Sequence, residues 1–148
     1  MARAYLTRRV TFAAAHRYRR PEWDDARNAQ VFGLCARHHY HGHTYTCDVT
    51  VGGPIDEQTG FVVDLGVLDR VLATEVRERY DHRNLNLDIA EFADGRQIPS
   101  GENLARLIFA QVQAALGDTV QVVEVKVAED ATLWSSYRGE DDAPVARG

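Results

Sequence analysis

The chain has 148 residues, of which 45% are hydrophobic and 26% are charged, values that are ordinary for one soluble globular domain. Its formal net charge of −5 argues against nonspecific binding to nucleic acid, although local arginines could still bind an anionic small molecule. The sequence holds no run of 18 apolar residues, so we expect no membrane span, and its start lacks the apolar region of a signal peptide, so we expect a cytoplasmic protein.

The first predicted element is a strand from Tyr5 to His16, because apolar and polar residues alternate along it. A single histidine at a strand end is commonly only a surface residue. The segment that follows, residues 17–40, is a long loop, and long loops in compact domains are functional or disordered. Its aromatic residues and Cys35 favour a functional loop. The two cysteines, Cys35 and Cys47, indicate chemistry or core packing more than a disulfide.

A second strand is predicted from about Thr44 to Val51, directly after two histidines that a single glycine separates, His41 and His43. Residues i and i+2 of an extended chain lie on one face, about 6–7 Å apart, so both imidazoles could hold one ion. If the first two strands pair antiparallel, the end of one meets the start of the next, and His16 becomes the third ligand of a zinc site. A solvated histidine-rich loop is the alternative.

From Leu65 the apolar period becomes helical, and a helix is predicted to about Tyr80 with Asp64 as its N-cap. Asp81 and His82 follow directly. A carboxylate can orient an imidazole and raise its basicity, but polar residues also commonly follow a helix. Because neighbours on an extended chain point opposite ways, we expect these two side chains to serve a third group separately.

Residues 87–98 are expected to form an irregular connection, and a second helix then begins after its N-cap Ser100 and ends at Gly117. Glu102 in its first turn suits the helix dipole, which is a sufficient structural reason for a carboxylate there. Glu102 is also a candidate for binding a substrate.

The clearest strand runs from Val120 to Glu129, and a short final strand is predicted from Leu133 to Tyr137. Glu129 falls on the apolar side of its strand, where a carboxylate is costly without a partner. It is therefore a candidate ligand-binding group, unless the strand has already ended and Glu129 is solvated.

The predicted order of elements is β-β-α-α-β-β, which indicates an α+β fold with a four-stranded antiparallel sheet and two helices on one face. We expect one domain over residues 1–138 and a disordered tail over residues 139–148.

Several short motifs, in this order, resemble those of the 6-pyruvoyl-tetrahydropterin synthase and 6-carboxy-tetrahydropterin synthase family, whose members have the tunnelling fold (T-fold). The likeness covers about Phe12 to Glu140. The motifs are Phe12-Ala13-Ala14-Ala15-His16, Phe32-Gly33-Leu34-Cys35, His41-Gly42-His43-Thr44-Tyr45, Gly60-Phe61-Val62-Val63-Asp64-Leu65, Asp81-His82-Arg83-Asn84-Leu85-Asn86, Pro99-Ser100-Gly101-Glu102-Asn103, Val127-Ala128-Glu129 and Tyr137-Arg138-Gly139-Glu140. Singly these motifs are modest, but together they are specific.

The resemblance implies that three histidines hold a catalytic Zn2+. The histidines that match the family's ligands are His16, His41 and His43. Three neutral imidazoles leave zinc an open position, which is typical of catalytic zinc.

The resemblance also implies roles for the other candidates. Cys35 matches the catalytic cysteine that removes substrate protons, and a thiol near zinc and a histidine can lose its proton near neutral pH. Asp81 and His82 match the companion relay, and Glu129 matches the glutamate that anchors the pterin ring. Such a carboxylate can accept two parallel hydrogen bonds from the pterin.

The family's substrate is 7,8-dihydroneopterin triphosphate, and its members are usually homo-hexamers, dimers of trimers with sites between subunits. The spacing from Cys35 to His41 resembles the enzymes that form a 6-pyruvoyl product, for tetrahydrobiopterin. Ser100-Gly101-Glu102 resembles the enzymes that form a 6-carboxy product, for queuosine. Both products remain open, as do an aldolase-like reaction to a 6-hydroxymethyl pterin and a non-catalytic zinc- or pterin-binding role.

The sequence leaves several side chains without an assigned role. His38 and His39 could compete for metal, although exposed loop imidazoles are the simpler interpretation, and Cys47 lies within the second strand. The triphosphate needs cations, which the sequence does not rank; the candidates are Arg17, Arg19, Arg37 and Arg83.

Overall fold

The structure is a computed structural model, and it describes residues 1–140. The disordered tail expected over residues 139–148 therefore lies mostly outside the described residues. The strands are β1 Arg3–His16, β2 His41–Pro54, β3 Arg83–Asn84, β4 Gln121–Asp130 and β5 Leu133–Tyr137. The helices are α1 Asp25–Phe32, α2 Leu65–Leu72, α3 Glu78–Tyr80, α4 Leu85–Asp88 and α5 Gly101–Leu116, with short 3₁₀ turns at Gly33–Ala36 and Ala90–Phe92 and a π-helical turn at Ala73–Arg77.

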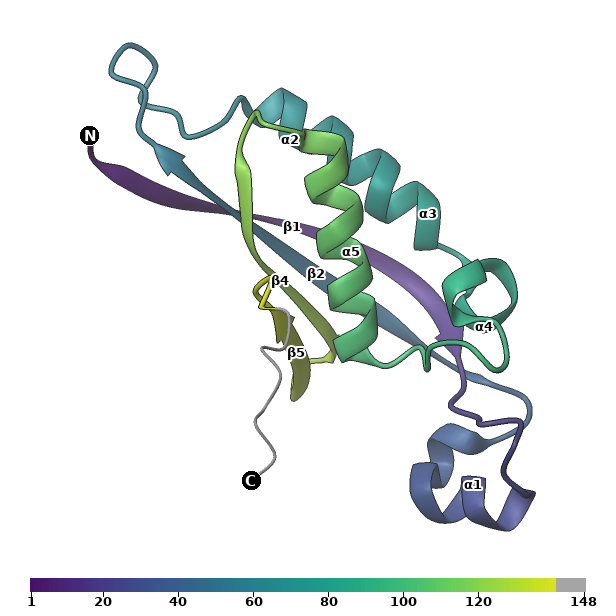
Figure 1. Cartoon of the computed structure of the whole chain (residues 1–148). Coiled ribbons are helices and arrows are strands. Elements are labelled where there is room, and N and C mark those ends of the chain that lie inside the picture. The colour runs from purple at the N-terminus through teal and green to yellow at the C-terminus, as the bar shows by residue number, and fades with distance from the viewer. Residues whose placement is uncertain (141–148) are drawn as a thin grey trace, which may run out of the picture.

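One five-stranded sheet in the order β3-β1-β2-β4-β5 forms the frame of the molecule. Helices α2, α3 and α5 lie against one face of it (Figure 1). The α+β class is confirmed, whereas the prediction of four strands, all antiparallel, is wrong. The fifth strand, β3, pairs parallel to β1 through only two residues, which is too short to show any period in a sequence.

Strands β1 and β2 pair antiparallel along their whole length, from Arg3 opposite Pro54 to His16 opposite His41. Both strands extend beyond the predicted bounds, and β2 begins at His41, three residues before the predicted start. Alternate residues of β1, Val10, Phe12 and Ala14, face the core and are buried. His16 continues that series, so the fold places the first candidate ligand on the helix-covered face.

The helical layer begins and ends largely where the sequence predicts. Residues 65–80 form one continuous helical run through the π turn, and the Asp64 carboxylate accepts hydrogen bonds from the N–H groups of Gly66 and Val67. Ser100 caps α5, and Gly117 ends it in a left-handed conformation with a φ of 56°. The apolar stripes of both helices, which include Leu68, Leu72, Val76, Leu104, Ile108 and Val112, are buried against the sheet.

The segment between β1 and β2 is ordered and contains α1, which the sequence analysis treats only as a loop. Asn28 explains much of this order, because its side-chain amide donates to the carbonyls of Arg20, Trp23 and Asp24. The rings of Trp23 and Phe32 also stack at 5.8 Å. In Figure 1, α1 lies apart from the helical layer, beyond the ends of the strands that carry the candidate histidines.

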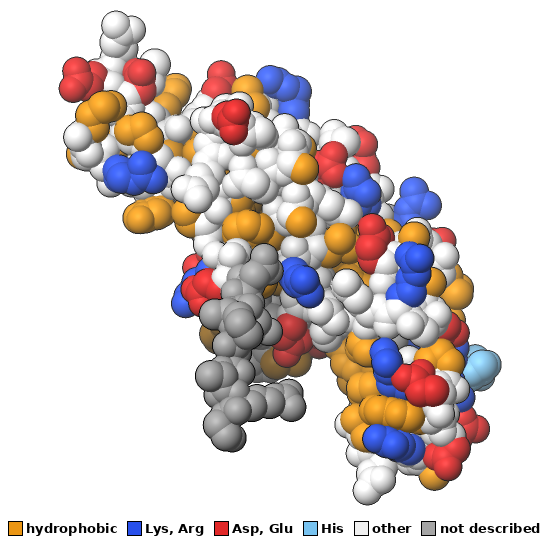
Figure 2. All heavy atoms as spheres, in the orientation of Figure 1, with side chains coloured by type: hydrophobic (Ala, Val, Ile, Leu, Met, Phe, Trp, Pro, Cys, Tyr) orange, Lys and Arg blue, Asp and Glu red, His pale blue; other side chains and the backbone are white. Residues whose placement is uncertain are grey.

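Acidic and basic side chains are interspersed over the face drawn in Figure 2, without a large area of one sign. Among the described residues, no helix combines the length and the apolar character that crossing a membrane requires.

Candidate functional site

The three candidate histidines converge at one end of the β1–β2 pair. Antiparallel register sets His16 opposite His41 and Ala14 opposite His43, which places all three imidazoles on one face. The ring centroids lie 4.6 Å apart for His16 and His41, 5.2 Å for His16 and His43, and 5.0 Å for His41 and His43. One potential ligand nitrogen from each ring lies within 4.8 Å of the others.

The chemistry of these three side chains fits a divalent cation such as zinc. His16 is fully buried, and its Nδ1 lies 2.8 Å from the carbonyl oxygen of Pro99, which places the ring proton on Nδ1 and leaves Nε2 free to ligate. Burial lowers the pKa of His16 to about 4 and also lowers the pKa of His41, so both rings are neutral near pH 7. Nε2 of His43 is buried without a hydrogen-bond partner. A cation would satisfy that nitrogen.

Glu129 lies beside the histidines and is not a solvated strand end. Its side chain is only 12% exposed, and its Oε1 accepts a hydrogen bond of 3.2 Å from the hydroxyl of Tyr18. Its Oε2 lies 3.8 Å from Nε2 of His43. The carboxylate is therefore positioned between a neutral donor and the imidazole cluster, within reach of any ligand held there.

Cys35 reaches the same region from the turn Gly33–Ala36, where its carbonyl accepts a 2.8 Å hydrogen bond from the N–H of Tyr18. The thiol is half-buried. Burial, and secondly the charge of Glu129, raise the pKa of Cys35 above its usual value. Both causes favour the protonated thiol over the thiolate. Without a bound metal, the chain therefore does not promote the loss of the Cys35 proton that the sequence analysis expects near neutral pH.

Asp81 and His82 form a pair, although the sequence analysis expects their side chains to point apart. His82 has a left-handed backbone with a φ of 61°, and its Nδ1 lies 3.0 Å from Oδ2 of Asp81. The other carboxylate oxygen accepts a 2.8 Å hydrogen bond from the N–H of Ala13, which is the main cause that lowers the pKa of Asp81. The expectation that the two side chains point apart is wrong, since the left-handed residue turns the imidazole back to the carboxylate.

This pair does not join the histidine cluster within one chain. Its imidazole is 85% exposed and lines a hollow with the strand residues Ala13, Ala15 and Thr44. Those three residues alternate with His16 and His43 along their strands and so face the opposite side of the sheet. Ala14 and His43, which are their neighbours in the strands, also border this hollow, but alternation directs their side chains to the other face. The Asp–His pair and the histidine cluster are therefore separated by the sheet.

Glu102 is exposed in the first turn of α5, as a helix-dipole partner would be. Its charge adds, after burial, Glu129 and Cys35, to the raised pKa of Tyr18, so Glu102 lies within electrostatic range of that tyrosine.

The remaining candidates lie elsewhere. His38 and His39 are exposed in the loop before β2, and His38 Nδ1 lies 3.0 Å from the guanidinium of Arg17. Cys47 is fully buried in the core, as expected.

Tyr18 and Tyr45 are the site residues that the sequence analysis does not single out. The hydroxyl of Tyr45 lies 3.1 Å from Nδ1 of His16, and the ring of Tyr18 contacts the ring of His16 edge-on at 5.0 Å. Alternation could have indicated both, because Tyr45 follows His43 by two residues and Tyr18 follows His16 by two.

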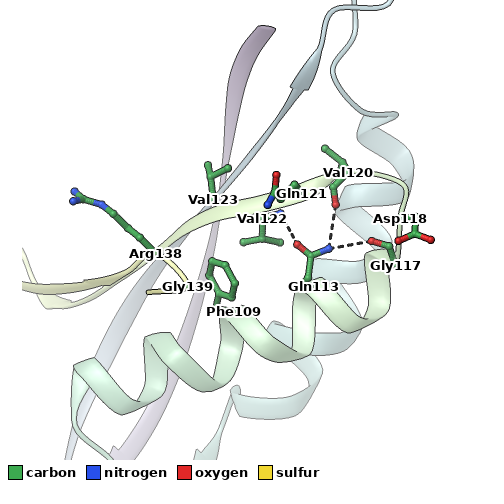
Figure 3. A pocket seen from close by; sticks show the side chains of 10 residues that line it. All are labelled: Phe109, Gln113, Gly117, Asp118, Val120, Gln121, Val122, Val123, Arg138 and Gly139. Carbon is green, nitrogen blue, oxygen red and sulfur yellow. Dashed lines mark hydrogen bonds between the residues drawn. The ribbon is translucent and has the colours of Figure 1, made fainter. Parts of the chain in front are cut away.

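A hollow of about 750 Å³ lies at the other end of α5 and has a structural explanation. Figure 3 shows the side-chain amide of Gln113 at its base, where it donates to the carbonyls of Gly117 and Val120 and accepts from the N–H of Val122. Its charged lining residues, Asp118 and Arg138, do not form a cluster suited to metal or acid–base chemistry.

Comparisons with known proteins identify relatives of this chain. A family model described as 6-pyruvoyl tetrahydropterin synthase matches residues 5–140. The 6-pyruvoyl tetrahydrobiopterin synthase of Drosophila melanogaster is 43% identical over 137 residues, which are 92% of this chain and 80% of that protein. The 6-carboxy-5,6,7,8-tetrahydropterin synthase of Bacillus subtilis is 38% identical over 112 residues, 72% of this chain and 71% of that protein. A solved structure of Caenorhabditis elegans 6-pyruvoyl tetrahydropterin synthase has a TM-score of 0.88 at 28% identity, covering 95% of this chain and 98% of that one.

Proposed function

Because the chain belongs to the 6-pyruvoyl tetrahydropterin synthase family, we propose that it is a zinc-dependent lyase that eliminates triphosphate from 7,8-dihydroneopterin triphosphate. The observation that carries this proposal is the convergence of His16, His41 and His43 beside the partly buried carboxylate of Glu129. The three imidazoles would hold the metal, and the carboxylate would bind the pterin ring.

Zinc held by the three histidines would polarise the hydroxyl groups of the substrate side chain and so acidify the adjacent C–H bonds. Glu129, with Glu102 nearby, would accept hydrogen bonds from the ring N–H and amino groups of the pterin. A pocket that uses those donors strongly rejects rings that lack them. The residues of this chain would thus bind and orient the substrate before any proton moves.

Cys35 would take the proton from the substrate side chain. Since the pKa of its thiol is raised in the chain alone, it needs a second base to accept its own proton. We assign that role to His82, oriented by Asp81. Because this pair lies on the other side of the sheet, we propose that it acts in the site of a neighbouring protomer in a homo-hexamer.

We propose the 6-pyruvoyl product for this enzyme. The Drosophila relative, which is named for that product, is 43% identical and aligns with 92% of this chain. The Bacillus relative, which is named for the 6-carboxy product, aligns with 72%. The 6-carboxy product of the queuosine pathway is therefore the second candidate.

Incubation of the zinc-loaded protein with 7,8-dihydroneopterin triphosphate, followed by mass spectrometry, tests this proposal. We expect release of triphosphate and a 6-pyruvoyl pterin. A 6-carboxy product with acetaldehyde would select the second candidate, and a 6-hydroxymethyl pterin would indicate the aldolase-like reaction. Absence of turnover by zinc-loaded protein would contradict all three enzymatic readings.

Two variants test the assigned roles. Cys35→Ala is expected to retain stoichiometric zinc but lose most turnover, because its sulfur is not among the three ligands. His41→Ala is expected to lose the zinc itself. If Cys35→Ala kept full turnover, or if His41→Ala kept stoichiometric zinc, the corresponding assignment would be wrong.

A further inference from the structure

Tyr18 connects the three parts of the proposed site. It lies two residues beyond His16, and the two rings meet edge-on at 5.0 Å. Its N–H donates to the carbonyl of Cys35 at 2.8 Å, and its hydroxyl donates to Oε1 of Glu129 at 3.2 Å. Its ring also contacts Phe32 edge-on at 5.8 Å, so aromatic neighbours on two sides fix the direction of the hydroxyl.

The hydrogen bond from the Tyr18 hydroxyl matters because the Glu129 carboxylate has a second possible partner. Its other oxygen lies 3.8 Å from Nε2 of His43, the buried nitrogen without a hydrogen-bond partner. A carboxylate is itself a common ligand of zinc. A free Glu129 side chain could therefore rotate toward the imidazole cluster and give up the orientation in which it faces a pterin.

We propose that Tyr18 is the positioning residue of Glu129: its hydroxyl holds the carboxylate in the orientation that binds the pterin and away from the histidine cluster. This inference rests on the proposed function, in which Glu129 binds the pterin ring. Tyr18 acts through Glu129 and is not required to touch the substrate. The packed ring of Tyr18 fixes the position of its hydroxyl, and the hydroxyl orients the carboxylate of Glu129 through the hydrogen bond.

Tyr18→Phe tests the inference, because it removes the hydroxyl and keeps the ring against His16 and Phe32. The probe is neopterin, a fluorescent pterin without phosphate, titrated into the full-length zinc-loaded protein. We expect Tyr18→Phe to weaken neopterin binding about tenfold, as loss of one hydrogen bond to a charged group implies. In turnover, KM is expected to rise by a similar factor while kcat changes by less than about threefold.

Tyr5→Phe is the matched control, since Tyr5 is an exposed tyrosine near the start of β1, at the far end of that strand from His16. It is expected to bind neopterin like the unaltered protein. Zinc content and thermal midpoint are measured for each variant. If Tyr18→Phe lost zinc or stability in proportion to its loss of binding, its role would be structural and the inference would be overturned.

A double-mutant cycle with Glu129→Ala, which removes the acceptor of the Tyr18 hydroxyl, tests whether Tyr18 acts through Glu129. In that background we expect Tyr18→Phe to change neopterin affinity by less than about twofold. If the effects of the two substitutions on neopterin affinity were fully additive, the inference would be overturned. Unchanged affinity in Tyr18→Phe alone would overturn it while leaving the proposed function intact, whereas failure of the unaltered protein to bind neopterin would overturn both.

Discussion

At the scale of single residues, the site depends on keeping ionisable groups neutral in a confined space. His16 is fully buried at the end of β1, with its Nδ1 proton directed to the carbonyl oxygen of Pro99. Protonation would place a charge in a dry environment beside two further imidazoles, His41 and His43. The arrangement therefore favours a metal ion over a proton near neutral pH.

This burial predicts acid sensitivity of the metal-free chain. The pKa of His16 falls from 6.5 to about 4 on folding, so between these values the unfolded chain binds more protons than the folded one. The contribution of neutral His16 to the free energy of unfolding is therefore fully present above pH 6.5. It is lost as the pH drops toward 4, which lowers the free energy of unfolding by up to about 3 kcal/mol. Urea unfolding in a chelator across this range measures the loss. His16→Gln should show a smaller slope, and an unchanged slope would contradict the assignment.

Metal removal should lower the thermal midpoint of the zinc-loaded protein. A ligand that binds only the folded state stabilises it, by about 4 kcal/mol when its free concentration is a thousand times Kd. Chelation should remove this increment in the unaltered protein and in His39→Ala, because His39 lies in an exposed loop. His43→Ala should show no response to chelator, as followed by differential scanning calorimetry. A response of unchanged size in His43→Ala would exclude His43 as a ligand.

At the scale of elements, the sequence predicts the helices and strands whose apolar residues recur with a regular period. The bounds of β5 and the caps of α5 agree with the prediction, because an alternating strand and a Ser–Gly pair of helix ends are local signals. The position of Glu129 on the inner face also follows from alternation. These elements position most of the candidate site.

Other elements depend on contacts that periodicity does not report. Strand β4 contains an irregularity, so that Val122 and Val125, three residues apart, are both buried where strict alternation would separate them. Strand β3 forms because the N–H of His82 bonds to the carbonyl of Ala13. The left-handed conformation of His82 could not be predicted from its residue type, because only a few per cent of non-glycine residues adopt it. The sequence therefore indicates Asp81 and His82 as candidate residues, but it does not predict that their side chains contact each other.

The junction between α5 and β4 predicts a stability effect far from the site. The amide of Gln113 makes three hydrogen bonds there, to Gly117, Val120 and Val122 (Figure 3). Gln113→Ala leaves these backbone groups without that partner and should destabilise the fold by about 1–3 kcal/mol. Gln121→Ala is the control, because Gln121 is exposed on the adjacent strand. Urea unfolding compares the two, with zinc content expected to stay unchanged in both. Equal stability of the two variants would show that Gln113 has no special role.

At the scale of the whole molecule, the sheet separates groups that the proposed reaction needs together. The histidine cluster lies on the helix-covered face, while the hollow beside His82 faces the other side. The sheet is a rigid frame, so no side-chain rotation can bring His82 around it to Cys35. The proposed homo-oligomer would resolve this separation, because each protomer would present its Asp81–His82 pair to the cluster of another.

Mixed oligomers test this arrangement. Cys35→Ala and His82→Ala should each be nearly inactive alone and retain zinc, because neither residue is a proposed ligand. Coexpressed with two different tags and purified through both, they should recover activity if each site takes its cysteine from one protomer and its pair from another. In an equal random mixture about a quarter of the sites would be complete. If Cys35 and His82 had to come from the same chain, no complete site could form, and activity of the mixture would stay at the level of the separate variants.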